Sequence, residues 1–174
     1  TCDHVLYETG DHGAPVLPAM KIGANLVVMS SIPVETARDQ AEKATACGIG
    51  YLDAPVSGGE KGATDGTLAI MAGGEQTAFD ALVPAFKAMG RPTRIGPAGT
   101  GQLAKLANQI IVGNTLATVA EALIFAKMGG ADPAAVRAAL LGGFADSTIL
   151  QQHGERMCVG NWKPGGFSRY QLKD

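Results

Sequence analysis

The chain has 174 residues, of which 46% are hydrophobic and 17% charged, and its formal net charge is −2. This composition excludes an intrinsically disordered chain and predicts one domain plus part of a second. The slightly negative charge excludes nucleic acid and anionic membrane surfaces as expected partners, because both select for a basic surface.

Other bulk features narrow the class of protein further. Apolar runs such as residues 110–112 are interrupted by Asn, Gly or Thr well short of a membrane span, so we expect no membrane partner. The histidines are scattered without metal-ligand spacing, and we expect no metal site. The chain starts at Thr without Met, so we interpret it as a fragment. Three widely spaced cysteines suit a reducing, cytoplasmic compartment: Cys2, Cys47 and Cys158.

The first half of the chain alternates predicted strands and helices. A helix ends at Val5–Tyr7, and Gly and Pro residues predict a connecting loop over residues 10–23. Strands are predicted at residues 26–29, 51–52, 67–71 and 93–95, and helices at residues 34–47 and 75–89. This alternation predicts an α/β fold with a parallel or mixed sheet flanked by helices.

The second half is predicted to be helical. Residues 102–128 form one apolar-rich segment without proline, which as a helix would be about 40 Å long. Such a length predicts a buried helix that connects or dimerises domains. Asp132 and Pro133 predict the start of a further helix that ends at Leu141, and a short helix is predicted from Ser147.

A serine–glycine turn follows the second predicted strand and is the first candidate for chemistry. Ser57 supplies a hydroxyl, and Gly58 and Gly59 expose successive backbone N–H groups. Ligands of open α/β sheets bind beyond the carboxyl ends of strands, where this turn is expected. The turn could therefore hold a carboxylate or phosphate, and a purely structural tight turn explains the local sequence equally well.

A second glycine cluster, residues 96–101, precedes the long helix. Its spacing is G-x-x-G-x-G rather than G-x-G-x-x-G, and no acidic residue ends a strand about twenty residues later, so we reject it as a pyrophosphate loop. Lys105 and Asn108 lie three residues apart on one helix face. Apolar neighbours predict a buried Lys105 with a lowered pKa, whereas a lysine that extends to water is the alternative for any single helical lysine.

Three segments occur along the chain in this order: Asp53-Ala-Pro-Val-Ser-Gly-Gly59, Gly66-Thr-Leu-Ala-Ile-Met-Ala-Gly-Gly74 and Gly96-x-x-Gly-x-Gly-x-x-x-Lys105-x-x-Asn108. Together they resemble the β-hydroxyacid dehydrogenase family, which includes 3-hydroxyisobutyrate and 6-phosphogluconate dehydrogenases. The resemblance covers nearly the whole chain. It implies the C-terminal part of a Rossmann-type NAD(P)-binding domain over residues 1–98 and a partial all-α domain over residues 99–174.

The resemblance also implies an activity and roles for individual residues. A small β-hydroxy acid and its aldehyde, of the tartronate semialdehyde and glycerate type, would be interconverted with NAD or NADP. Lys105 would be the catalytic proton donor or acceptor. The implied substrate-binding residues are Ser57, Gly58, Gly59 and Asn108, and the implied cofactor-binding residues are Ser31 and Lys173.

Departures from the family pattern leave alternatives open. The G-x-G-x-x-G unit and the residue that selects NAD or NADP do not occur in these 174 residues, so we expect the chain alone to be inactive. A 3-hydroxyisobutyrate-type dehydrogenase and a non-catalytic NADP-binding interaction module are the alternatives, and a phosphorylated substrate ranks lower because basic residues are few. We expect a small carboxylate substrate and a homo-oligomer formed through the helical domain.

Overall fold

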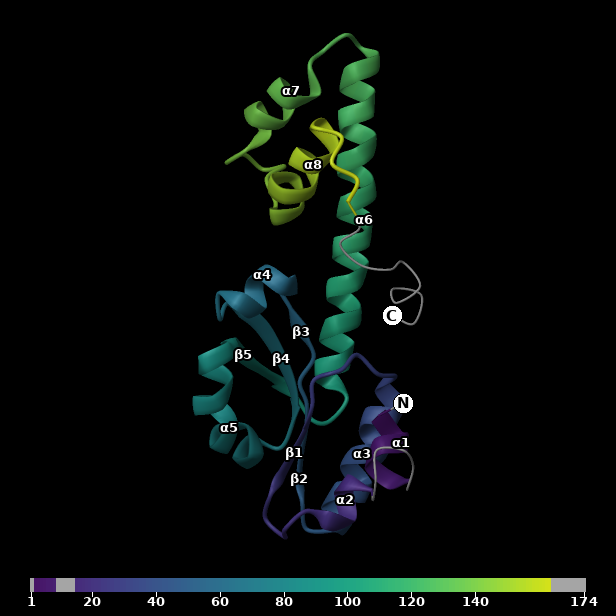
Figure 1. Cartoon of the computed structure of the whole chain (residues 1–174), viewed down its shortest axis with the longest axis vertical. Helices are drawn as coiled ribbons and strands as arrows, with labels where there is room; N and C mark the ends of the chain where they lie inside the picture. The colour runs from purple at the N-terminus through teal and green to yellow at the C-terminus, as the bar shows by residue number, and fades with distance from the viewer. Residues whose placement is uncertain (1, 9–14, 164–174) are drawn as a thin grey trace. The chain divides into compact units, whose positions relative to one another are not determined.

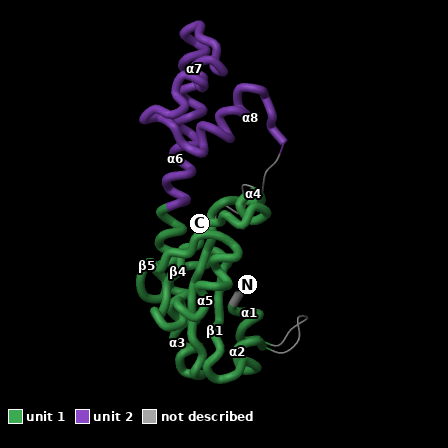
Figure 2. Tube along the Cα trace, turned by 90° about the vertical axis from the view of Figure 1, so that its left-hand side faces the viewer, with its two compact units in different colours: residues 1–107, 174 green, residues 108–173 purple. Residues whose placement is uncertain are grey.

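The structure is a computed structural model that describes residues 2–8 and 15–163. The chain divides into two compact units between Ala107 and Asn108, as Figure 2 shows. Helix α6 (Thr100–Met128) begins in the first unit and continues into the second. Each unit is described by itself below.

A five-stranded mixed sheet forms the centre of the first unit (Figure 1). The strands are β1 (Asn25–Val28), β2 (Gly50–Asp53), β3 (Val56–Ser57), β4 (Leu68–Gly74) and β5 (Gly90–Gly96). β1 pairs with β2 in parallel, and β4 pairs with β5 in parallel. β4 also pairs antiparallel with β2 and β3. The predicted α/β fold with a mixed sheet is therefore confirmed.

Helices cover both faces of this sheet (Figure 1). They are α1 (Cys2–Tyr7), α2 (Val16–Ala19) and α3 (Val34–Ala46) on one face and α5 (Gln76–Met89) on the other, whereas α4 (Gly59–Thr64) lies at the end of the sheet between β3 and β4. Alternating side chains of the strands pack into two separate cores, as the period of two in a strand requires. One core joins β1 and β2 to the first three helices, with buried residues Leu6, Leu17, Leu26, Val28, Ala44, Ile49 and Tyr51. The other joins β2 and β4 to α5, with buried residues Leu52, Ala54, Ile70, Ala72, Ala78, Phe79 and Phe86.

Two short stretches differ from the sequence-based prediction. Helix α2 lies inside the predicted loop 10–23, where its Leu17 is buried in the core although Pro15 precedes the helix and Pro18 lies within it. β3 and α4 were both missing from the prediction. β3 forms because Val56 and Ser57 pair with Ile70 and Ala69 of β4, a contact that no local pattern signals.

The second unit contains the rest of α6, α7 (Pro133–Leu140), a π-helical turn η1 (Leu150–Gly154) and α8 (Glu155–Cys158). Asp132 caps α7 as predicted, because its carboxylate accepts hydrogen bonds from the backbone N–H groups of Ala134 and Ala135. The buried core of this unit is small and consists of Val119, Leu123 and Leu150.

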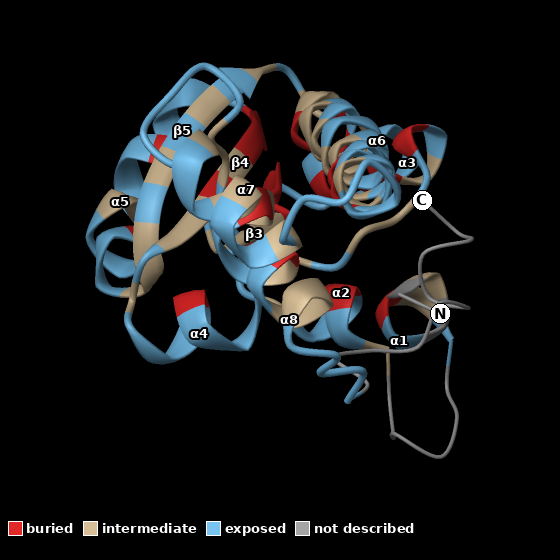
Figure 3. Cartoon of the chain, turned by 90° about the horizontal axis from the view of Figure 1, so that it is seen from above, coloured by how far each residue is buried: buried red, intermediate tan, exposed pale blue. Residues whose placement is uncertain are grey.

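The prediction that the long helix is buried is wrong for the part of the chain that the structure describes. Ile110, Ile111 and Phe125 are 64%, 66% and 80% exposed, and Figure 3 shows exposed residues along much of α6. The reason is that only Val119 and Leu123 of this helix enter the core of the second unit, opposite Leu150. By length and composition alone, α6 is also apolar enough to cross a membrane, with 11% of its most apolar window buried.

Candidate active site

Lys105 and the serine–glycine turn lie together in the first unit. Lys105 is half-buried on α6, and its Nζ donates a hydrogen bond to the carbonyl oxygen of Val56 at 3.0 Å. Val56 is the residue before Ser57 in β3. The ammonium group is therefore held beside the turn that the sequence singled out, although it is only partly buried.

The turn itself requires glycine at both positions. Gly58 and Gly59 have φ values of +143° and +61°, a region that side-chain-bearing residues rarely adopt. A Cβ atom on Gly58 would also lie 3.0 Å from Cδ2 of Leu68. Ser57, immediately before them, is half-buried and paired with Ala69. The backbone thus turns sharply without side chains that would shield it from a ligand.

Asp53, at the end of β2, links the sheet to the start of α6. The side chain is 0% exposed, and its two carboxylate oxygens accept hydrogen bonds from the backbone N–H groups of Gly99 at 2.7 Å and Gln102 at 2.8 Å. Burial raises the pKa of this carboxyl, whereas these N–H donors act in the opposite direction. The positive end of the helix dipole also favours a carboxylate here. Asp53 therefore holds the helix that carries Lys105.

The glycine cluster 96–101 lets the start of α6 lie close to the backbone of β2 and β4. A Cβ atom on Gly101 would lie 2.4 Å from the carbonyl oxygen of Met71 and 2.5 Å from that of Asp53. A Cβ atom on Gly73 would lie 2.7 Å from Oδ1 of Asp53. Because the N–H groups of Gly99 and Gln102 already bind a carboxylate, the geometry agrees with our rejection of this cluster as a pyrophosphate loop.

Gln102 connects the same helix to the loop after β1. Its side chain is 1% exposed, donates from Nε2 to the carbonyl oxygen of Ser30 at 2.9 Å, and accepts at Oε1 from the N–H of Ile32 at 3.2 Å. Ser31, the predicted cofactor contact, lies between these two residues and is half-buried. The structure thus places Ser31 in a loop that is anchored to α6.

Sequence reasoning assigned no role to Asp53 or Gln102. The partners of Asp53 lie 46 and 49 residues away, and those of Gln102 lie 70 and 72 residues away. No local pattern reports such contacts. The one available signal was that a charged residue ends an otherwise apolar strand, which is costly unless the charge is paired.

The two remaining predicted residues are not joined to this cluster by the structure. Asn108 is the first residue of the second unit, and its Nδ2 donates to Oε1 of Gln109 at 3.0 Å. It follows Lys105 by three positions on α6, as predicted for a shared helix face. Lys173 lies outside the described residues.

Known proteins resemble both parts of the chain. The family described as the NAD binding domain of 6-phosphogluconate dehydrogenase matches residues 3–113. The family described as the NAD-binding domain of NADP-dependent 3-hydroxyisobutyrate dehydrogenase matches residues 99–174. Together the two matches include every strand and helix that the structure describes, apart from the first residue of α1.

Individual relatives agree with this assignment. A 2-hydroxy-3-oxopropionate reductase of Escherichia coli K12 is 52% identical over 87% of this chain and 52% of the relative. A probable mitochondrial 3-hydroxyisobutyrate dehydrogenase-like protein of Arabidopsis thaliana is 39% identical over 95% of the chain and 54% of the relative. The chain therefore spans about half the length of the curated relatives it matches.

Solved structures show the same fold. The crystal structure of 3-hydroxyisobutyrate dehydrogenase from Salmonella typhimurium superposes with a TM-score of 0.80 at 28% identity, over 91% of this chain and 56% of that one. The enzyme of that name from Mycobacterium tuberculosis, described with L-serine, gives the same TM-score and identity over 91% of this chain and 57% of that one. On this sequence and structural agreement, the chain belongs to the NAD(P)-dependent β-hydroxyacid dehydrogenase family of 3-hydroxyisobutyrate and 6-phosphogluconate dehydrogenases.

Proposed function

We propose that these residues form part of an NAD(P)-dependent reductase that interconverts a small β-hydroxy acid and its aldehyde, of the tartronate semialdehyde and glycerate type. The observation that carries this proposal is the 3.0 Å hydrogen bond from Lys105 Nζ to the carbonyl of Val56, which holds an ammonium group beside Ser57 and the two glycines. The name of the 52% identical E. coli relative supports the choice of substrate.

The described residues fit the nicotinamide end of the cofactor. Ser31 lies beyond the carboxyl end of β1, which is where open α/β sheets bind their ligands. Its loop is anchored through the backbone groups of Ser30 and Ile32, on either side of Ser31. A bound nicotinamide cofactor supplies the hydride that reduces the carbonyl carbon. Lys173 is proposed as a second cofactor contact, on the resemblance alone.

The chain's own residues would supply the proton and hold the substrate. In the reductive direction, the Lys105 ammonium gives one proton to the carbonyl oxygen while that oxygen gains negative charge. In the oxidative direction, the neutral amine accepts the hydroxyl proton. Ser57 and the N–H groups of Gly58 and Gly59 bind the substrate carboxylate, and Asn108 orients the reacting group beside the lysine. One hydride from the cofactor and one proton from Lys105 would together convert the aldehyde to the alcohol, so electrons and protons balance.

We further propose the organisation of the whole protein. The NAD(P)-binding part covers residues 1–98, and a helical part from residue 99 onwards mediates self-association in the cytoplasm. Exposed apolar side chains on α6, such as Ile110 and Phe125, support the self-association, and the free thiols of Cys47 and Cys158 support a reducing compartment.

A 3-hydroxyisobutyrate dehydrogenase is the second candidate, since the named Salmonella and Mycobacterium structures share the fold.

Lys105→Ala in the complete polypeptide that contains these residues tests the proposal. We expect kcat for tartronate semialdehyde reduction to fall roughly 100- to 10,000-fold, because the alkoxide loses its proton donor. Binding of NADH or NADPH, measured by fluorescence, should change little. Lys105→Arg should not restore the rate, because a guanidinium does not release its proton near neutral pH.

Lys127→Ala is the matched control, since Lys127 is an exposed lysine in the last turn of the same helix. Its kcat should equal that of the unaltered protein. A Lys105→Ala rate within tenfold of the unaltered protein would exclude the proton-donor role. Faster turnover of 3-hydroxyisobutyrate than of glycerate in the oxidative direction would favour the second candidate.

A further inference from the structure

Gln102 is a buried polar side chain that the proposed chemistry leaves unused. Its amide nitrogen donates to the carbonyl oxygen of Ser30 at 2.9 Å, and its amide oxygen accepts from the N–H of Ile32 at 3.2 Å. Both halves of the amide are therefore satisfied, as a buried side chain with 1% exposure requires. The two bonded backbone groups are the immediate neighbours of Ser31 on either side.

The same turn of α6 is held at two other points. The backbone N–H of Gln102 donates to Oδ2 of Asp53 at 2.8 Å, and Lys105, three residues further on, donates to the carbonyl of Val56 at 3.0 Å. One helical turn thus contacts the loop after β1, the end of β2 and the start of the serine–glycine turn. All of these residues belong to the first unit.

We propose that Gln102 is a positioning residue that fixes the Ser31 loop relative to Lys105. The proposal rests on the proposed function, in which Ser31 contacts the nicotinamide cofactor and Lys105 transfers the proton. Hydride and proton must reach adjacent atoms of one carbonyl group, so a displacement of one contact relative to the other lowers the rate steeply. In this role the side chain of Gln102 acts through the backbone groups on either side of Ser31.

The pattern of donor and acceptor explains why glutamine is suited to this position. An ionised glutamate of the same shape would place a second acceptor against the carbonyl of Ser30, and methionine would fill the space without either hydrogen bond. A protonated glutamate, in contrast, offers one O–H donor and one carbonyl acceptor. Gln102→Glu should therefore fail to hold the Ser31 loop near neutral pH. It should hold the loop again as the pH falls and its carboxyl takes up a proton.

Amide hydrogen exchange tests, without any catalysis, whether Gln102 holds the Ser31 loop in place. We expect Gln102→Met to lower the protection of the Ile32 N–H roughly tenfold, because that group loses its acceptor. Gln102→Glu keeps an acceptor for Ile32, but near neutral pH its carboxylate repels the Ser30 carbonyl and should displace the loop, so protection should also fall there and should return in acid. Gln76→Met, which alters an exposed glutamine of α5, should leave Ile32 unaffected. Unchanged protection of Ile32 in both Gln102 variants would overturn the proposal.

Kinetics of the complete polypeptide then test the positioning role. Gln102→Met should lower kcat, raise the KM for NADH or NADPH roughly tenfold, and leave the shape of the pH profile of kcat unchanged. Combined with Ser31→Ala, it should add little, because both changes remove one contact. Additive effects, or equal rises in the KM of cofactor and aldehyde, would overturn the proposal. If the unaltered polypeptide neither binds nor oxidises NADH and NADPH, the proposed function fails, and the exchange data alone decide whether Gln102 holds the loop.

Discussion

The two units of the chain differ in how far their hydrogen-bonding polar side chains are buried. Among the described residues, the buried polar side chains all lie in the first unit: Gln40, Asp53 and Gln102. Their side chains bond to partners 11 to 72 residues away in sequence, such as Tyr51 for Gln40 and Ser30 for Gln102. Burying such groups costs free energy unless every donor and acceptor is paired, so each bond restricts where two distant segments lie.

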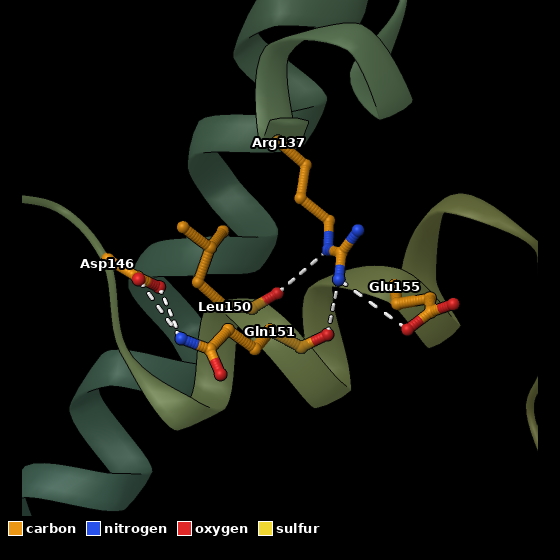
Figure 4. A network of polar contacts seen from close by, with 5 residues as sticks. All are labelled: Arg137, Asp146, Leu150, Gln151 and Glu155. Atoms are coloured by element: carbon orange, nitrogen blue, oxygen red, sulfur yellow. Dashed lines mark hydrogen bonds and ion pairs between the residues drawn. The ribbon is translucent and has the colours of Figure 1, made fainter. Parts of the chain in front are cut away.

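The second unit instead has a network of exposed or half-buried contacts between residues 5 to 18 apart in sequence. Arg137 donates to the carbonyl oxygens of Leu150 and Gln151 and pairs with Glu155, while Asp146 accepts from the Gln151 side chain (Figure 4). Water can replace most of these bonds at little cost. The difference teaches that the buried polar side chains of the first unit fix where distant segments lie, whereas water can substitute for the contacts of the second unit shown in Figure 4.

The largest effect that we predict for this comparison comes from adding one carbon atom in the first unit. Gly101→Ala should lower the free energy of unfolding by about 3 kcal/mol or more, because its Cβ would overlap two backbone carbonyl oxygens. At Gly113, on the same helix, an added Cβ would meet no atom within 4 Å. Gly113→Ala should therefore stabilise the chain by roughly 0.5–1 kcal/mol. Urea denaturation followed by circular dichroism measures both. Equal effects at the two positions would contradict the difference in packing.

A smaller effect should follow from Asp53→Asn. The new amide NH₂ would face a backbone N–H that now donates to the carboxylate, which should lower the free energy of unfolding by about 1–3 kcal/mol. The pKa of Asp53 is raised above its ordinary 3.8 in the folded chain. Its titration therefore favours the fold most at acidic pH, and this contribution is lost as the pH rises through the folded pKa.

Urea denaturation of Asp53→Asn and of the unaltered chain, from below pH 3.8 to neutral pH, checks the sign of this pH dependence. The stability advantage of the unaltered chain should be largest in acid and should shrink towards neutral pH. An advantage that grows towards neutral pH would mean that the backbone N–H donors outweigh burial, so that the pKa of Asp53 is lowered rather than raised.

The smallest effect is expected in the second unit, where the pH dependence should have the opposite sign to that of Asp53. The pKa of Asp146 is lowered by the backbone N–H of Gly142 and by the Gln151 side chain. Its contribution is therefore present above the ordinary pKa of 3.8 and is lost as the pH falls through the folded pKa. Asp146→Asn should weaken the chain slightly at neutral pH, and the difference should vanish in strong acid. A difference that persists there would exclude titration of Asp146 as its cause.

Much of the architecture could be predicted because local chemistry determined it. The apolar run around residues 26–29, the glycines after residue 47 and the Asp132–Pro133 cap each specify an element through its own neighbours. The motif residues Ser57, Gly58, Gly59 and Lys105 could be singled out for the same reason, since residue type and spacing mark them before any contact is known.

Only the tertiary structure decided how these elements meet. β3 exists through its pairing with β4, Lys105 meets Val56 across 49 residues, and Asp53 and Gln102 find their partners at similar separations. The physical reason is that backbone N–H and C=O groups are alike at every position. Which distant pair bonds therefore depends on how the sheet and helix pack, and glycines such as Gly101 only permit that approach without specifying the partner.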